Sequence, residues 1–446
     1  MSGTYDAIVN RYIERTKKSR ELHGEAKRLL PRGVSSNFRV VDPNPIFIES
    51  AVGATITDAD GNRYTDFSNA FGAMLVGHAH PKIVDAIAAQ AKRGTLHAMP
   101  HRLEISVAKE LRERFGQDQW RFANSGTEAT MHAIRLARGY TGRPGLLKFE
   151  GGYHGAHDTV LVSNKPPLRL AGLRSRPRPI PWSEGIPAES YAHTLVASFN
   201  DLKGVRALLE EHLNEVACVI LEPIMMNMGV TEPLPDFLPG LRALCNEFGA
   251  LLIFDEVKTG VKIARGGATE YFKVKPDITV LAKAIGGGMP LAAFGSSAEI
   301  MEELNSLRVI HVGTYASNPV TLAAAEATLK DILTDEAYRR VFALNKKLVD
   351  GYSTLIREHN LPCYANGVGS MGTINFRKDV IRDYRDWYVV DRVASQAWYL
   401  AMLNEGVIPQ PPGPDEQWTI SVQHTEADIE THLKAFAKVA PLLKSL

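Results

Sequence analysis

One lysine of this sequence stands where chemistry on a shielded amine is plausible. The segment 281–290 reads LAKAIGGGMP, and in it Lys283 follows the apolar run 278–281 and precedes three consecutive glycines. A lysine held away from water resists protonation and becomes a better nucleophile. Glycines let the backbone approach a ligand closely or adopt a positive φ. A surface lysine in a flexible turn explains these ten residues more simply, so the chemical interpretation needs support from elsewhere in the chain.

An acidic pair ends the apolar run that precedes this segment. Asp255 and Glu256 follow ALLIF at 250–254. In open α/β sheets, functional groups gather at the carboxyl ends of the parallel strands. Because Asp255 follows one predicted strand and Lys283 follows the next, we expect a carboxylate and an amine at one crevice. Acidic pairs at strand ends are also common as simple solvated groups.

The start of a predicted helix offers a site for an anion. The segment 124–139 reads NSGTEATMHAIRLARG, in which Ser125, Gly126 and Thr127 lead into a strongly helical run. Small residues at a helix start expose free backbone N–H groups at the positive end of the helix dipole, where phosphate binds. An ordinary N-cap is the more common explanation of such a pattern.

A glycine-flanked loop carries an aromatic residue. Tyr153 and His154 lie in GGYHG at 151–155, directly after the apolar run LLKF. An aromatic side chain at the end of a strand most often packs in the core or at its rim. The alternative is a stacking face for a flat ring.

Together these groups suit a flat, phosphorylated cofactor that carries an aldehyde. The amine would form an imine with the aldehyde, and the carboxylate would keep a ring nitrogen protonated. The helix start would bind the phosphate, and the aromatic residue would cover the ring. Pyridoxal phosphate has these features. Its protonated ring withdraws electrons from a substrate carbon that loses a proton, and the freed lysine amine moves that proton.

The elements that must position these groups lie between residues 70 and 330, where short apolar runs alternate with helical segments. The runs are LLKF (146–149), TLVASF (194–199), VACVILE (216–222), ALLIFDE (250–256), ITVL (278–281) and LAAFG (291–295). Runs this continuous suit strands buried on both faces by helices. Alternation of strands and helices predicts an α/β fold with a doubly wound, mostly parallel sheet. We therefore expect one large α/β domain over 70–330.

The two ends of the chain have different patterns. Residues 1–69 are expected to form an N-terminal helix followed by a small antiparallel segment, and residues 331–446 a smaller α+β domain. The expected elements are a helix over 5–30, strands within 46–67 around a DADGN turn, a helix over about 333–358, a strand over 368–376, a helix around 388–404 and a strand over 418–423. The segment 164–187, rich in proline, arginine and serine, is expected to be a long loop, either a solvated surface or a lid.

The composition excludes several classes of function. The formal net charge is +1, from 51 basic and 50 acidic residues, so no nucleic acid or anionic membrane is expected as a partner. The three cysteines, Cys218, Cys245 and Cys363, have no CxxC spacing, so neither a metal site nor a disulfide framework is expected. The N-terminus lacks the apolar region of a signal peptide, and no apolar run approaches the length of a membrane span. A cytoplasmic location fits best.

Several motifs, in their order and spacing, resemble those of fold-type I, class III aminotransferases. The motifs are NSGTEA, FEGGYHGAHD, LEPIMMNMG, FDEVKTG, LAKAIGGGMP and HVGTYASNP. The similarity covers nearly the whole chain and is strongest to the glutamate-1-semialdehyde aminomutase branch, which also contains aminotransferases for D-phenylglycine and β-amino acids. These motifs are highly specific for the fold and the cofactor, and much less specific for the substrate.

The resemblance implies a role for each matching residue. Lys283 matches the lysine of the Schiff base, and Asp255 the partner of the pyridinium nitrogen. Tyr153 matches the aromatic residue stacked on the ring, and Val257 the residue on the opposite face. Thr314 matches a threonine that reaches the phosphate of the other subunit, which implies a homodimer with shared active sites. The cofactor-binding residues implied are Ser125, Gly126, Thr127, Tyr153, His154, Glu222, Asp255, Val257, Lys283 and Thr314.

Substrate recognition is expected to depend on two N-terminal residues. Arg39 matches an arginine that binds a substrate carboxylate in the aminomutase branch, a task for which a planar guanidinium is well suited. An ordinary surface arginine is the alternative. Phe71 stands where the aminomutase has a tryptophan.

Two segments depart from the family pattern. The sequence KTGVK follows FDEV, and its Lys258, Val261 and Lys262 are expected to change the rim and the charge of the pocket. In the aminomutase, a mobile loop with a Gly-Ser-Gly stretch retains the diamine intermediate, whereas here 164–187 contains prolines and arginines. This difference favours an aminotransferase over an aminomutase.

The sequence therefore predicts a pyridoxal phosphate-dependent aminotransferase that works by a ping-pong mechanism. The donor is an amino acid, with β- and D-amino acids among the candidates, or an amine, and the acceptor is a keto acid. The alternative is glutamate-1-semialdehyde 2,1-aminomutase, an isomerase of tetrapyrrole synthesis, which shares every cofactor residue. A protein that binds the cofactor without catalysis is a further alternative, disfavoured by the intact Lys283 and Asp255.

Overall fold

The computed structural model describes residues 3–444, which divide into two compact units. The larger unit comprises residues 81–335 and 381–388, and the smaller comprises, within the described range, residues 3–80, 336–380 and 389–444. The boundaries therefore lie at 80/81 and 335/336, whereas the sequence suggested 69/70 and 330/331. The short segment 381–388 belongs to the larger unit although both of its flanks belong to the smaller one.

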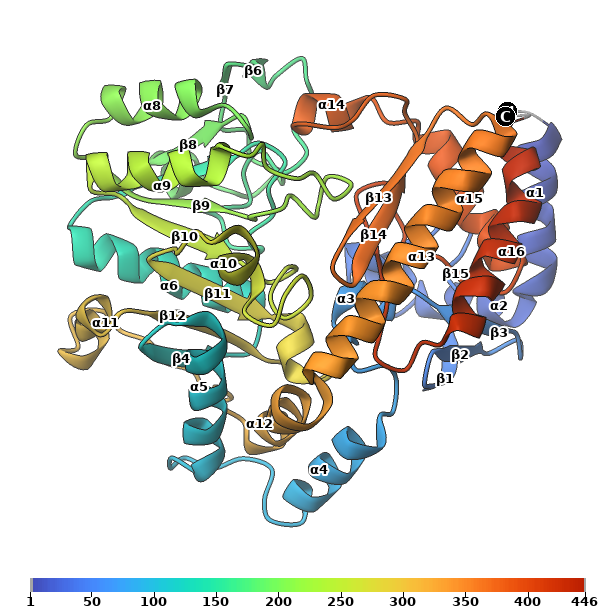
Figure 1. Ribbon diagram of the computed structural model, residues 1–446, viewed down its shortest axis with the longest axis horizontal. Helices are drawn as coiled ribbons and strands as arrows, with labels where there is room; N and C mark the ends of the chain where they lie inside the picture. Colours follow the sequence, from blue (N-terminus) through green and yellow to red (C-terminus); the bar gives the residue numbers. More distant parts are fainter. Residues whose placement is uncertain (1–2, 445–446) are drawn as a thin grey trace. The chain divides into compact units, whose positions relative to one another are not determined.

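A seven-stranded sheet organises the larger unit, with strand order β4-β12-β11-β10-β9-β5-β8 (Figure 1). Its strands are β4 Gln119–Ala123, β5 Gly145–Phe149, β8 Thr194–Ala197, β9 Val216–Leu221, β10 Leu251–Asp255, β11 Ile278–Ala282 and β12 Ala292–Ser296. Strand β12 pairs antiparallel with both of its neighbours, while the other pairs are parallel. The prediction of an α/β fold with a mostly parallel sheet is confirmed; strand β4 was not predicted.

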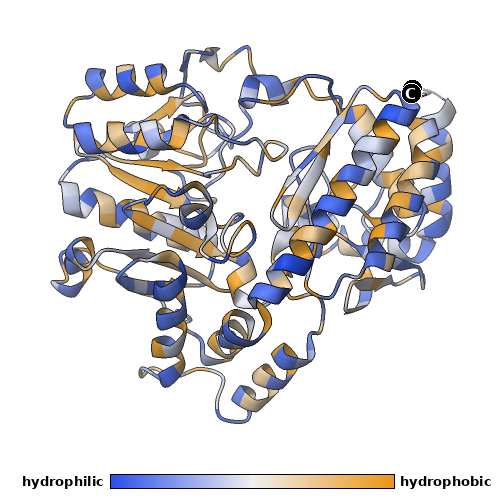
Figure 2. Ribbon diagram, viewed as in Figure 1, coloured by the Kyte–Doolittle hydropathy of each residue, from blue (hydrophilic) through white to orange (hydrophobic). Residues whose placement is uncertain are grey.

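The composition of these strands explains their position. Every residue of β5, β9, β10, β11 and β12 is buried, and Figure 2 shows β9, β10 and β11 as largely hydrophobic. Such strands are stable only when helices cover both faces of the sheet. The remaining elements of the unit are α4 Pro81–Ala91, α5 Arg102–Phe115, α6 Gly126–Thr141, β6 Gly172–Leu173, β7 Arg176–Pro177, α7 Ala188–Tyr191, α8 Leu202–Glu211, α9 Phe237–Phe248, α10 Gly267–Phe272, η3 Lys283–Gly286, α11 Ala298–Asn305, α12 Pro319–Glu326, η4 Ala327–Ile332 and α14 Tyr384–Tyr388.

Glycines end three of the helices that pack on the sheet. Gly116, Gly142 and Gly249 follow α5, α6 and α9, each with a left-handed backbone. Glycine adopts this conformation without the steric cost that other residues incur, which is why it commonly follows a helix. These stop signals help to place the next strand at the correct distance.

The smaller unit contains two small sheets, β1-β2-β3-β15 and β13-β14-β16. Its elements are α1 Gly3–Arg15, α2 Lys17–Ala26, η1 Pro31–Gly33, η2 Asn37–Arg39, β1 Ile48–Val52, β2 Thr55–Asp58, β3 Arg63–Asp66, α3 Asn69–Gly72, α13 Asp335–His359, β13 Tyr364–Val368, β14 Met371–Asn375, α15 Arg392–Asn404, β15 Val407–Ile408, β16 Trp418–Thr419 and α16 Glu426–Leu443. An aromatic cluster forms part of its core: Tyr352 stacks on Trp418 and Phe436, with ring centroids 5.2 and 4.2 Å away.

Three expectations for this unit need correction. The helix expected over 5–30 is two helices broken at Thr16, whose hydroxyl donates to the carbonyl of Tyr12 and competes with the helix backbone. The strand expected over 368–376 is the turn and second strand of the β13–β14 hairpin. The strand expected over 418–423 is regular only over its first two residues.

The described part of the chain contains no helix long and apolar enough to span a membrane. Nor does it contain a group of three or more histidine, cysteine, aspartate or glutamate residues that could hold a metal ion. The three cysteines are buried and free.

Candidate active site

Four neighbouring parallel strands present polar groups at their carboxyl ends. In the order β11, β10, β9 and β5, the strands are followed or ended by Lys283, Asp255, Glu222 and the loop 150–155. The pairing of β10 with β11 brings the ends of these two strands together, as predicted. The sheet therefore gathers an amine, two carboxylates and an aromatic loop along one edge.

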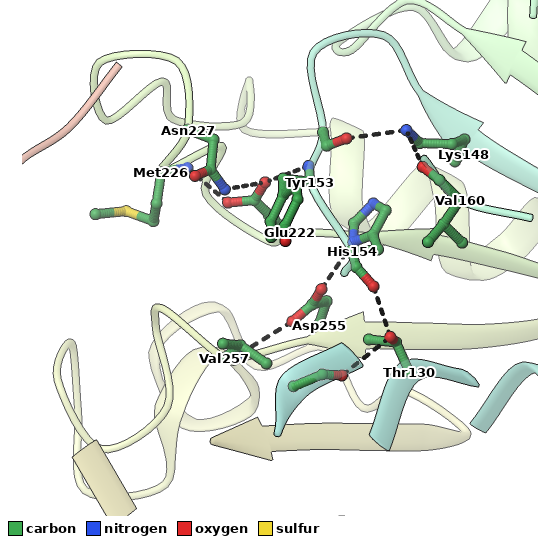
Figure 3. A network of polar contacts seen from close by, with 12 residues as sticks. Thr130, Lys148, Tyr153, His154, Val160, Glu222, Met226, Asn227, Asp255 and Val257 are labelled. Atoms are coloured by element: carbon green, nitrogen blue, oxygen red, sulfur yellow. Dashed lines mark hydrogen bonds and ion pairs between the residues drawn. The ribbon is translucent and has the colours of Figure 1, made fainter. Parts of the chain in front are cut away.

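Asp255 is buried at the centre of a polar network (Figure 3). Its Oδ2 lies 2.7 Å from Nδ1 of His154, and its Oδ1 accepts the backbone N–H of Val257 at 3.1 Å. The carbonyl of His154 in turn accepts the hydroxyl of Thr130 at 2.5 Å. Each carboxylate oxygen thus has one protein partner and retains a lone pair for a further N–H donor.

Glu222 fixes the backbone beside the aromatic loop (Figure 3). Its carboxylate accepts the N–H of Tyr153 at 3.0 Å, the N–H of Met226 at 3.0 Å and the side-chain amide of Asn227 at 2.8 Å. Burial raises the pKa of Glu222, while these donors oppose the rise. Glu222 therefore positions Tyr153 through its backbone.

Lys148 is a buried lysine that the sequence did not point to. It lies on β5, and its Nζ donates to the carbonyls of Gly152 at 2.9 Å, Val160 at 3.1 Å and Val162. Burial lowers the pKa of Lys148 to about 7, while three carbonyl acceptors match the three donors of an ammonium group. The available signal was a lysine inside the apolar run LLKF. This side chain ties both ends of the loop that carries Tyr153 and His154 to the sheet.

The N-terminus of α6 has the form of an anion site. Ser125 accepts the N–H of Glu128 at 3.2 Å, and Glu128 accepts the N–H of Asn124 at 2.8 Å, which is a reciprocal cap. Among the described residues, no hydrogen bond uses the N–H groups of Gly126 or Thr127. Both the N-cap and the anion interpretation of this segment are thus compatible with the structure.

Two glycines allow the helix start, the aromatic loop and the end of β10 to pack closely. A Cβ on Gly126 would lie 3.0 Å from Cγ2 of Val257, and one on Gly155 would lie 2.7 Å from Cα of Thr127. The N–H of Ala156 donates to the hydroxyl of Thr127 at 3.1 Å, which joins the loop to the helix. Residues predicted to hold the phosphate and the ring therefore pack against one another, and the close backbone approach at the helix start is compatible with a phosphorylated group.

Lys283 adopts a strained backbone directly after β11. Its φ is +54°, and it begins the short turn η3. The side chain is half-buried. A Cβ on Gly287 would lie 2.5 Å from Oγ1 of Thr328 and 2.9 Å from Cδ1 of Ile83, so this glycine packs against neighbouring helices.

Thr314 lies apart from this group in the chain's own fold. It is exposed in the segment 309–318, beside Val312 and Tyr315, which are 76% and 62% exposed. No hydrogen bond or ion pair within the described range 3–444 joins Thr314 to the other predicted cofactor residues.

The two predicted substrate residues line one pocket of the smaller unit. This pocket has a volume of about 500 Å³ and is mostly apolar. Arg39 is exposed and donates to the hydroxyl of Ser35 at 3.1 Å, and the rings of Phe38 and Phe71 lie 6.2 Å apart. Phe71 has a φ of +58°, which a bulky residue rarely adopts.

The basic residues after β10 are not on a rim. Lys258 is 5% exposed and Lys262 is fully buried. The expectation that they change the charge of the pocket's rim is therefore wrong, because the turn after Asp255 folds back into the protein. Glu256 is fully buried as well, and burial raises its pKa to about 7.

Hydrogen bonds and an ion pair hold the loop 164–187 in place. Its start is held by the side chain of Asn164, which donates to the carbonyl of Gly152 at 2.8 Å, and by the hydroxyl of Tyr384, which donates to the carbonyl of Pro166 at 2.8 Å. Farther along, Arg174 pairs with Asp383 at 2.6 Å. The segment 381–388 therefore holds this loop at two points.

Arg385, also in the segment 381–388, holds the start of the aromatic loop in place. It binds the buried carboxylate of Glu150 through two N–H groups at 2.6 and 2.9 Å, and it also donates to the carbonyl of Ala171 at 3.1 Å. Glu150 directly precedes GGYHG. The sequence offered no signal for this pair, because the two residues are 235 positions apart.

Comparisons with known proteins place these features in a family. The family model described as "Aminotransferase class-III" matches residues 38–439. A glutamate-1-semialdehyde 2,1-aminomutase of Syntrophobacter fumaroxidans is 40% identical over 434 residues, which are 96% of this chain and 98% of that protein.

Solved structures give similar results. An omega-transaminase from Sphaerobacter thermophilus superimposes with a TM-score of 0.90 at 34% identity, over 95% of this chain and 97% of that chain. A β-phenylalanine aminotransferase from Variovorax paradoxus gives 0.86 at 31% identity, over 98% of this chain and 96% of that chain.

Proposed function

Because the chain belongs to the class III aminotransferase family, we propose that it is a pyridoxal phosphate-dependent aminotransferase that moves an amino group from an amino acid or amine to a keto acid. The observation that carries this choice is the fastening of loop 164–187 by the segment 381–388. An aminomutase must keep its intermediate until a second transfer, which a mobile lid assists. A ping-pong aminotransferase releases its keto product between half-reactions, and a fixed loop does not hinder that release.

The residues at the sheet edge suit the cofactor. The start of α6 would bind the phosphate, Asp255 the ring nitrogen, and the amine of Lys283 the aldehyde carbon, with Tyr153 and Val257 on the two faces of the ring. When bound, pyridoxal phosphate draws electrons from the substrate carbon that loses its proton. The close packing at Gly126 supports this assignment, since a side chain there would push Val257 out of position.

The chain's own groups then move and hold protons. Lys283 Nζ takes the proton from the amino-bearing carbon of the donor and returns a proton in the opposite half-reaction. His154 and the N–H of Val257 donate to Asp255 and so hold its carboxylate in place. Glu222 and Lys148 fix the peptide group between Gly152 and Tyr153, Glu222 through its N–H and Lys148 through its carbonyl.

We assign the substrate carboxylate to Arg39, beside Phe71. A guanidinium binds a carboxylate through two parallel N–H groups. The apolar lining of the pocket that holds both residues supports a donor with an apolar side chain. Donors with a β-amino or D-amino group are included in this proposal.

A homodimer is part of the proposal. Leu307, Ile310, Val312 and Tyr315 are at least half exposed around Thr314, and apolar residues that gather on a surface mark contact sites. A second copy would cover them and bring Thr314 to the partner's phosphate. The buried free cysteines support a cytoplasmic location.

The first experiment is a titration of the purified holoenzyme with single amino donors and no acceptor. The donors are L- and D-alanine, L-glutamate, a β-amino acid, D-phenylglycine and a simple amine. We expect one of them to convert the visible band of the bound pyridoxal form to that of the pyridoxamine form, and a keto acid to reverse the change. If every donor leaves the band unchanged, the aminotransferase proposal is wrong.

Glutamate-1-semialdehyde 2,1-aminomutase is the second candidate. The 40% identity to such an enzyme over nearly the whole chain supports it. Incubation of the holoenzyme with glutamate-1-semialdehyde alone tests it. Formation of 5-aminolevulinate without a donor or an acceptor, together with no response to the donor panel, would favour the aminomutase.

A further inference from the structure

Trp182, near the end of loop 164–187, lies beside Tyr153. The rings of Trp182 and Tyr153 have centroids 6.4 Å apart and cross at 81°, an edge-to-face pair. The residue Trp182 is nevertheless 39% exposed. An apolar ring surface is therefore open directly beside the residue assigned to the cofactor ring.

The backbone of Trp182 is held in place. Its N–H donates to the carbonyl of Leu161 at 3.0 Å, and Val162 forms a bridge with Pro181. Ser163 completes this pairing: its N–H donates to the carbonyl of Ile180 at 2.7 Å. Residues 180–182 are thus paired with residues 161–163, which follow the aromatic loop.

The ring of Trp182 is also held by a cation. Nζ of Lys165 lies 5.8 Å from the ring centroids of both Trp182 and Trp387. Trp387 is buried and belongs to the segment 381–388, which fastens the loop. A cation near an aromatic face is attracted to it. The partly exposed indole is therefore a preorganised surface.

We propose that Trp182 is a specificity-determining residue that contacts the side chain of the amino donor and favours donors that carry an aromatic ring. This inference rests on the proposed function, because only an aminotransferase takes an amino donor whose side chain varies. An ordered aromatic wall binds a flat apolar group with little loss of conformational freedom. A small donor such as alanine does not reach the wall and gains nothing from it.

The test compares half-reactions of the wild-type, Trp182→Ala and Trp182→Phe holoenzymes. The donors are β-phenylalanine and D-phenylglycine as ring-bearing probes, and L- and D-alanine as small ones. For Trp182→Ala, we expect the donor concentration at half-maximal rate to rise about tenfold for the ring-bearing donor that the enzyme accepts, as expected for the loss of one aromatic contact and its buried area. We expect a change below about twofold for alanine, and a value for Trp182→Phe between the other two.

Tyr271→Ala is the matched control. Tyr271 is also a partly exposed aromatic residue of the larger unit, 47% exposed, in an edge-to-face pair with Phe272. The Tyr271→Ala variant should leave the donor concentration at half-maximal rate unchanged for both classes of donor. The midpoint of thermal unfolding of each variant shows whether it folds, and Trp182→Phe keeps the comparison valid if the alanine variant does not.

The outcomes separate the two proposals. An equal change for alanine and the ring-bearing donor, or no change for either, overturns the role of Trp182 and leaves the aminotransferase intact. A wild-type enzyme that accepts alanine but no ring-bearing donor also overturns the role of Trp182 and leaves the aminotransferase intact. A wild-type enzyme that responds to no donor overturns the aminotransferase and this inference with it.

Discussion

At Lys283 the backbone lies in the left-handed region, which costs a residue with a side chain roughly 1–2 kcal/mol. Strain of this kind persists only where the surrounding structure holds it, and it collects at functional sites. Here β11 ends at Ala282, and the turn η3 begins at Lys283 itself. The strained residue thus lies at the edge of the sheet where Asp255 ends the neighbouring strand.

Replacement of Lys283 by alanine tests the residue on which the chemistry depends. We expect Lys283→Ala to lower the rate of the donor half-reaction by at least about 10²-fold, because no other group is assigned to move the proton. The rate follows from the decay of the visible band of the reconstituted enzyme after a donor is added.

Lys273→Ala is the control for the previous variant. Lys273 is an exposed lysine of the same unit with a φ of +58°. It has the same backbone strain as Lys283, but there the left-handed residue ends helix α10. It should retain the wild-type rate. A Lys283→Ala enzyme within about tenfold of wild type would contradict the assignment.

At the scale of elements, the aromatic loop is held by charged groups that come from different parts of the chain. Lys148 holds the loop from the strand before it, Glu222 from the end of β9, and Arg385 from the segment 381–388. Each of these residues is buried or nearly so. The loop therefore has a fixed shape before any ligand arrives, which lowers the cost of ordering it on binding.

Lys148 predicts a pH dependence of stability. Its pKa is lowered from about 10.5 in the unfolded chain to about 7, so the unfolded chain binds more protons between these values. The contribution of Lys148 to the free energy of unfolding is fully present above pH 10.5. It is lost progressively as the pH falls from there through about 7, with a slope of at most ~1.4 kcal/mol per pH unit. We expect denaturant unfolding of Lys148→Met to lack this contribution to the slope.

The matched control for Lys148→Met is Lys346→Met. Lys346 lies on the exposed surface of α13 and pairs with Asp350. The variant should keep the wild-type slope between pH 7 and 10. Equal slopes for wild type and Lys148→Met would mean that Lys148 keeps its proton through this range.

The fastening by segment 381–388 predicts unequal effects of two arginines. Arg385→Ala leaves the buried carboxylate of Glu150 without its partner, which typically costs about 3–5 kcal/mol. Arg174→Ala removes an arginine whose side chain is 54% exposed, so we expect about 1 kcal/mol or less. Denaturant unfolding measures both, and limited proteolysis should cleave within 164–187 faster in Arg385→Ala. Similar losses for the two variants would contradict this account.

At the scale of the whole molecule, the proposal requires a second copy of the chain. The segment 309–318 presents Thr314 on an exposed apolar surface, and Thr314 makes no bond to the cofactor residues of its own described chain. An active site shared between two copies explains both observations. Cofactor binding should then depend on the association of two chains.

A charge on this surface should weaken the dimer. We expect Val312→Asp to raise the dimer dissociation constant by about tenfold or more, because burial of an unpaired carboxylate is costly. Sedimentation velocity at several concentrations measures the association, and cofactor retention should fall in parallel. Leu213→Asp, at a residue that is 59% exposed after α8, is the control and should leave association unchanged. A Val312→Asp protein that remains dimeric at the same concentrations would exclude this surface as the interface.

The sequence by itself determined the fold class and predicted that the strands before Asp255 and Lys283 are neighbours. These features depend on a local pattern, the alternation of continuous apolar runs with helical segments. The expectation that Asp255 and Lys283 follow neighbouring parallel strands needed only the rule that ligands bind at the carboxyl ends of such strands. The family motifs added the roles of single residues, which stay proposals.

Only the tertiary structure decided which groups hold the site together. Lys148, Glu222 and Arg385 contact the aromatic loop across separations of up to 235 residues, and no local pattern encodes such a distance. The same holds for the burial of Lys258 and Lys262, the antiparallel direction of β12, and the position of Trp182 beside Tyr153. A buried polar group needs a partner, but the sequence does not say which one, because that depends on how the chain returns to the same place.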